Sequence, residues 1–160
     1  MIINTDAIVL KTFSYGETSL ISRCFTKDKG KISFIIKGAK SKKNLVSPYF
    51  QPLSFINIIY KENEKRELQI VSKVSFVQIW TKIPLSLRKM SLSQSILEIS
   101  DFTLEKNDPY PSLFNILIKT LQIFESRDID ENILFWNYEI KILSEMGFMI
   151  NIDDNSDSGL

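Results

Sequence analysis

Residues 18–37 read TSLISRCFTKDKGKISFIIK and contain the pattern that decides the fold of the first half of the chain. Two short runs rich in β-branched and apolar residues are separated by Lys27-Asp28-Lys29-Gly30. In the second run, Ile32, Phe34 and Ile36 fall on one face, which is the period of a β-strand with one buried side. Gly30 can adopt a positive φ at the end of the turn, so we predict a β-hairpin.

Three further runs have the composition of strands, and they lie at residues 6–13, 53–60 and 68–77. A charged turn at residues 61–66 separates the last two. Five strands with turns at short intervals are typical of a small barrel or sandwich.

From residue 85 onward the apolar residues recur at helical spacing, which predicts three helices. Their stripes are Leu85, Leu92, Ile96, Ile99 and Thr103; Leu113, Ile116, Leu117, Thr120, Leu121 and Phe124; and Ile133, Trp136, Ile140, Leu143 and Gly147. Pro84 suits a first helical turn, Asp108 or Ser112 a cap of the second helix, and Asp130 with Glu131 the start of the third. We therefore predict an α+β fold with a β-domain at 1–80, a helical domain at 81–152 and a disordered tail at 153–160.

The formal net charge of +1 conceals two halves of opposite sign. Residues 1–80 contain 13 Lys and Arg against 6 Asp and Glu, and residues 81–160 contain 7 against 13. Between residues 23 and 43 there are eight basic residues and a single acid, Asp28. Lysine is a point charge that suits phosphate contacts without base reading, so this segment predicts nucleic-acid binding that is sensitive to salt. An ordinary solvated surface is the alternative.

Aromatic residues close to this basic segment are candidates for stacking on bases. They are Tyr15, Phe34, Tyr49 and Phe50. Phe34 alternates with Ile32 and Ile36, so we expect it in the core instead.

The chain contains one cysteine, Cys24, and no histidine. An internal disulfide and histidine-dependent catalysis are therefore excluded, and Cys24 is expected to be a small buried residue in a strand. No signal peptide is recognisable, and no uncharged apolar run reaches the length of a membrane span. These features favour a non-enzymatic protein of a reducing cytoplasm that does not associate with membranes.

Two ordered motifs resemble the RecO family of bacterial DNA repair and recombination mediators. The first is Thr5-Asp6-Ala7-Ile8-Val9-Leu10-Lys11-Thr12 followed by Tyr15-Gly16-Glu17-Thr18-Ser19-Leu20-Ile21. The second is Phe25-Thr26-Lys27-Asp28-Lys29-Gly30-Lys31 followed by Phe34-Ile35-Ile36-Lys37-Gly38-Ala39-Lys40. Gln51-Pro52-Leu53 and the segment from Phe135 to Gly147 also fit the family, and the similarity covers residues 1–153.

The resemblance implies a five-stranded OB-fold barrel followed by a small helical domain. It also implies binding of single-stranded and double-stranded DNA, annealing of complementary strands, and help for RecA in replacing single-stranded DNA-binding protein. RecR and the C-terminal tail of the single-stranded DNA-binding protein are the implied partners, in a bacterial cytoplasm near the nucleoid. The implied DNA contacts are Lys31, Lys37, Lys40, Lys42 and Lys43, with Arg23 and Lys29 as further candidates.

The sequence departs from the family in two places. Many relatives have Cys-x-x-Cys-Gly where this chain has Asn155-Ser156-Asp157-Ser158-Gly159. Asn and Ser do not replace thiolate ligands, so we predict that no zinc is bound. We predict no other cofactor either. The family also continues for many more helical residues, so the chain is either a fragment or lacks the C-terminal part. An OB-fold adaptor that binds protein, or an RNA-binding module, remains the alternative function.

Overall fold

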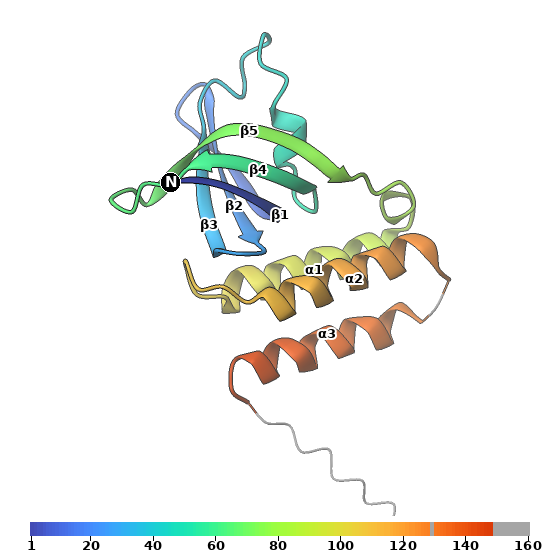
Figure 1. The fold of residues 1–160 in the computed structure, drawn as a ribbon. Coiled ribbons are helices and arrows are strands. Elements are labelled where there is room, and N and C mark those ends of the chain that lie inside the picture. Colours follow the sequence, from blue (N-terminus) through green and yellow to red (C-terminus); the bar gives the residue numbers. More distant parts are fainter. Residues whose placement is uncertain (129, 149–160) are drawn as a thin grey trace, which may run out of the picture.

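The computed structural model describes residues 1–128 and 130–148. In this part of the chain five strands form a closed barrel in the order β1-β2-β3-β5-β4 (Figure 1). Their bounds are β1 Ile2–Tyr15, β2 Ser19–Thr26, β3 Gly30–Ile36, β4 Phe55–Lys61 and β5 Leu68–Gln78. β3 and β5 are parallel, and the other neighbours are antiparallel. The expected OB-fold barrel is thereby confirmed.

The long strand β1 closes the barrel because it pairs with two neighbours. Its first half pairs with β4 and its second half with β2, and an irregularity in the β1–β2 register lies between Val9 and Lys11. Such a bulge bends a strand and increases its twist, which allows one strand to follow a curved wall.

The barrel interior is filled by the side chains that alternate along the strands. Ile32, Phe34 and Ile36 are all buried, as the alternation predicted, and the ring of Phe34 packs edge-on against Tyr60 at 5.1 Å between centroids. Phe50 belongs to the 3₁₀ helix η1 (Ser47–Phe50) and is fully buried in the same cluster.

Three helices follow the barrel: α1 Leu87–Thr103, α2 Pro111–Ser126 and α3 Glu131–Glu145. α1 and α2 both lie beneath the barrel, and α3 packs against both of them on the side away from the barrel (Figure 1). A second core joins the barrel to this helical layer, where Phe25 and Phe114 pack edge to face at 5.3 Å between ring centroids. The α+β architecture predicted from the sequence is therefore present.

The starts of α1 and α2 differ from the sequence-based prediction. Pro84 and Leu85 belong to the 3₁₀ helix η2 (Ile83–Leu85), Leu85 is 87% exposed, and α1 begins only after the extended residue Ser86, whose hydroxyl accepts a hydrogen bond from Lys89 N. α2 begins at Pro111 without a side-chain cap. Asp108 instead accepts a hydrogen bond from the hydroxyl of Tyr110, so both predictions of a cap for this helix were wrong.

α3 has the ends expected from the sequence but presents its stripe to solvent. Asp130 caps the helix through Asn132 N, and Gly147, with φ of +87°, follows its last turn. Ile133 and Trp136 are 60% and 58% exposed, whereas Tyr138 and Ile142 are buried on the opposite side. The predicted tail at 153–160 and the Asn155–Gly159 stretch lie outside the described residues.

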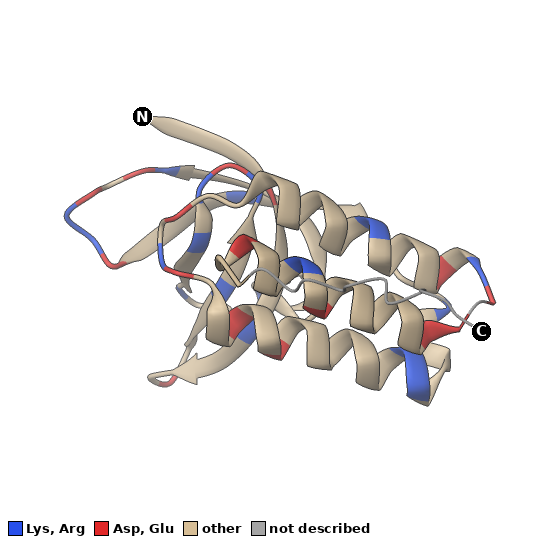
Figure 2. Ribbon diagram, turned by 90° about the horizontal axis from the view of Figure 1, so that it is seen from below, with Lys and Arg blue, Asp and Glu red and all other residues tan. Residues whose placement is uncertain are grey.

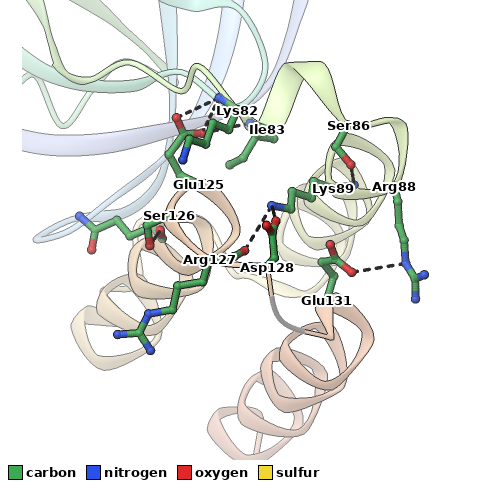
Figure 3. A network of polar contacts seen from close by, with 11 residues as sticks. Lys82, Ile83, Ser86, Arg88, Lys89, Glu125, Ser126, Arg127, Asp128 and Glu131 are labelled. Carbon is green, nitrogen blue, oxygen red and sulfur yellow. Dashed lines mark hydrogen bonds and ion pairs between the residues drawn. The ribbon is translucent and has the colours of Figure 1, made fainter.

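A network of polar contacts ties the exit of the barrel to the helices (Figure 3). The Glu125 carboxylate accepts hydrogen bonds from the backbone N–H groups of Thr81, Lys82 and Ile83 and from the Thr81 hydroxyl, at 2.7–3.0 Å. The buried Lys89 donates to the carbonyl oxygen of Arg127 at 3.2 Å. The segment that links the barrel to the helical layer is therefore held by α2.

Candidate nucleic-acid interface

Residues 37–46, which we call the lysine loop, connect β3 to η1 and carry four of the predicted DNA contacts. The side chains of Lys37, Lys40, Lys42 and Lys43 are all exposed. Ala39 is buried in the barrel core and Lys40 N donates to Thr18 O at 3.0 Å, so the loop is anchored to the barrel at its middle. The chain therefore presents these charges from an ordered support.

The charges of the lysine loop are not neutralised within the part of the chain that the structure describes. There, none of its four lysines lies within 4.0 Å of a carboxylate, and Lys40 Nζ makes only a long contact of 3.5 Å with the carbonyl oxygen of Gly16. Cations without an internal partner are free to bind phosphates.

Three other predicted DNA contacts are engaged within the protein. Arg23 forms an ion pair of 2.7 Å with Asp101 of α1, and Lys29 forms one of 2.9 Å with Glu62. Lys31 Nζ donates to the main-chain oxygen of Asp101. Burial lowers the pKa of Lys31, and the charge of Asp101 opposes this effect. The exposed lysines of the loop thus differ from Arg23, Lys29 and Lys31, whose side chains already have partners within the protein.

The helical layer does not offer a comparable basic surface. Acidic and basic positions are interspersed along α1, α2 and α3 (Figure 2). Attraction for a polyanion is weakened where carboxylates lie among the cations. The lysine loop is therefore the better candidate for contact with phosphates.

Two of the four candidate stacking residues are buried and therefore cannot contact a base. Phe34 and Phe50 are fully buried, which confirms the core position expected for Phe34. Tyr15 is 52% exposed at the end of β1, and Tyr49 packs against Phe76 with 4.5 Å between ring centroids. Only Tyr15 and Tyr49 remain available at the surface.

Lys73 lies near the lysine loop in space and was missed by the sequence reasoning. It is exposed on β5, and together with Lys37 it lines a groove between β5, the end of β3 and the loop. An isolated lysine in a strand gives no local signal, because it lies 36 positions after Lys37 in the sequence. Pairing of β3 with β5 brings the two together.

A metal site is not formed by the described residues. No group of three or more Cys, Asp or Glu side chains with metal-binding geometry occurs among residues 1–128 and 130–148. Cys24 is fully buried, as expected, and burial raises the pKa of its thiol to about 12 against the lowering effect of Ser22. In this described part, no helix has both the length and the apolar character needed to cross a membrane.

Comparison with known families assigns both halves of the chain. The family model described as "Recombination protein O N terminal" matches residues 1–80, and the one described as "Recombination protein O C terminal" matches residues 84–160. This chain belongs to the RecO family. The resemblance seen in the sequence motifs is confirmed.

Several curated relatives named "DNA repair protein RecO" are similar to this chain. The relative from Salinibacter ruber is 32% identical over 75% of this chain and 46% of its own length. The relatives from Streptococcus gordonii and Chloroherpeton thalassium are 30% and 26% identical over 95% and 94% of this chain, and over 57% and 58% of their own lengths. The chain therefore spans about half to three-fifths of the relatives it matches, and its membership places it in a family of DNA repair proteins.

Proposed function

We propose that this chain is a non-enzymatic recombination mediator that binds single-stranded and double-stranded DNA through the lysine loop. The observation that carries the proposal is the exposure of Lys37, Lys40, Lys42 and Lys43 on an anchored loop of the barrel. Membership of a DNA repair family supports DNA as the polyanion.

The proposed mechanism is electrostatic. Lysines that neutralise phosphates release the counterions condensed on DNA, which gives affinity with little dependence on base sequence. Two strands whose phosphates are partly neutralised repel each other less, so complementary strands can approach and pair. Annealing then requires no catalytic group.

The proposal extends to the partners implied by the family. We propose that the chain acts with RecR and with the C-terminal tail of the single-stranded DNA-binding protein, and thereby helps RecA to occupy single-stranded DNA near the nucleoid. Family membership is the support for these partners.

The test is replacement of Lys37, Lys40, Lys42 and Lys43 by Glu, followed by titration with single-stranded and duplex DNA at several salt concentrations. We expect binding and annealing to be lost. Replacement of the same lysines by Gln should reduce the slope of log affinity against log salt for single strands by about 3, since each neutralised phosphate contributes about 0.7. Unchanged affinity or an unchanged slope would contradict the assignment.

The matched control replaces by Glu four exposed lysines elsewhere in the chain: Lys65, Lys106, Lys119 and Lys141. It changes the net charge by the same amount, so a general charge effect would appear equally in both variants. Parallel titrations with RNA of equal length and with a peptide of the single-stranded DNA-binding protein's tail address the two alternative functions. Preference for RNA, or peptide binding without DNA binding, would favour those alternatives.

A further inference from the structure

The groove beside the lysine loop lies where the pairing of β3 with β5 ends. β3 pairs with β5 only from Ser33 to Ile35, opposite Leu68 to Ile70, whereas β5 continues along β4. Residues 44–46 of the lysine loop also line this space. The groove has a volume of about 500 Å³, which lies within the range of about 300–1,000 Å³ found for ligand pockets.

The lining of this groove is apolar and partly exposed. Ile35, Leu45, Ile70 and Tyr49 are among its lining residues. Leu45 is 79% exposed and Ile70 is 38% exposed, and Tyr49 is held against Phe76. An apolar surface of this kind at a concave site favours a ligand with an apolar face.

The charges around the groove specify the kind of ligand. Lys37 and Lys73 line it, and no carboxylate does so among the described residues. Two other cavities differ in this respect, since the one between the barrel and α1 includes Glu98 and Asp101, and the one near Lys29 includes Glu62 and Glu64. A groove with apolar walls and two lining cations matches a polyanion that carries flat apolar groups.

We propose that this groove receives an unstacked base of single-stranded DNA, with Lys37 and Lys73 bound to phosphates next to that base. This inference rests on the proposed function and adds a distinction to it. Bases in a duplex are stacked and paired, and exposing one costs a few kcal/mol, whereas a single strand offers its bases freely. The lysine loop binds either form of DNA, and the groove favours the single strand.

The test compares oligo(dT) with an abasic oligonucleotide of equal length, which has the same phosphates but no bases. We expect the protein to bind oligo(dT) roughly tenfold more tightly, as one base contact of about 1–3 kcal/mol would give. The double variant Leu45→Ser and Ile70→Ser should lose this ratio while its affinity for the abasic strand stays the same. Lys73→Gln should weaken the binding of both oligonucleotides. It should also reduce the slope of log affinity against log salt by about 0.7, the contribution of one phosphate.

The matched control is the double variant Ile79→Ser and Leu85→Ser, which removes two apolar side chains that are 63% and 87% exposed and do not line the groove. It should keep the tenfold ratio. Equal affinity of the unmodified protein for the two strands, or a ratio that survives in the groove variant, would overturn the inference but leave DNA binding intact. Absence of binding to every oligonucleotide would overturn the proposed function itself, and a base preference seen with RNA alone would overturn the assignment to DNA.

Discussion

Glu125 organises the junction between the barrel and the helices with a single side chain. Its carboxylate accepts hydrogen bonds from three consecutive backbone N–H groups, which no helix or strand would otherwise satisfy. Burial acts to raise the pKa of Glu125, but the hydrogen bonds from Ile83, Lys82 and Thr81 outweigh it and lower the pKa to about 2. The ionised form is therefore the one that stabilises the fold.

We predict that Glu125→Gln destabilises the protein by about 1–3 kcal/mol near neutral pH, because hydrogen bonds to a charged acceptor are lost. The folded pKa lies below the ordinary value of 4.5, so the stabilisation is complete above that value and disappears as the pH falls toward about 2. Thermal unfolding across this range should show a Tm difference that shrinks with acidification. Glu98→Gln, at an exposed position of α1, is the control and should show no such difference.

The burial of single residues was predictable from the sequence where the alternation of apolar and polar residues was clear. Phe34 and Cys24 are buried as their alternation and residue type indicated. The role of Glu125 was not predictable, because its partners lie 42 to 44 residues away in sequence.

The hairpin of β2 and β3 contacts the connection between α1 and α2. Gly30 has a positive φ of +70°, as expected from its place at the end of the hairpin turn. A Cβ atom added to Gly30 would overlap the carbonyl group of Asp108. Asn107 N also donates to Lys31 O at 3.1 Å. The start of β3 is thus a docking point for the helical connection.

We predict that Gly30→Ala destabilises the protein more than Gly16→Ala does. Gly16 also has a positive φ, of +60°, but an added Cβ would meet nothing within 4 Å. Gly16→Ala should therefore cost only the left-handed strain of roughly 1–2 kcal/mol, whereas Gly30→Ala adds a clash with backbone. Denaturant unfolding of both variants measures the difference, and equal losses of stability would show that the Asp108 contact is unimportant.

Helix boundaries show how far local patterns reach at the scale of elements. Asp130 and Gly147 mark the two ends of α3, as expected. Pro84 did not mark the start of α1, because the chain forms η2 and then an extended residue before the helix begins. The spacing of the apolar residues predicted that α3 is a helix. It did not show which face of α3 packs against the other helices.

Across the whole molecule, the ion pair between Arg23 and Asp101 joins the barrel to α1. Arg23 comes from β2, and the carboxylate of Asp101 is only 16% exposed. Lys31 contacts the main chain of the same residue. Arg23 and Lys31 therefore connect the barrel to the helical layer.

We predict that Arg23→Met lowers stability by about 1–2 kcal/mol, since it leaves a mostly buried carboxylate without its partner while partial exposure limits the loss. Its affinity for DNA should fall less than that of Lys40→Met, which removes the same charge from the lysine loop. A double-mutant cycle with Asp101→Asn measures the coupling. If Arg23→Met lost more DNA affinity than Lys40→Met, Arg23 would have to be counted among the DNA contacts.

The sequence by itself determined the two-part organisation, the barrel strands, the buried face of β3 and the lysine-rich character of the loop. These follow from periodicity, turn chemistry and composition, which act over a few residues. Only the tertiary structure decided which cations remain free. Arg23, Lys29 and Lys31 found carboxylate or carbonyl partners across the chain, and Lys37 and Lys73 came together beside one groove. Strand pairing and helix packing create these contacts between residues distant in sequence, so local patterns cannot reveal them.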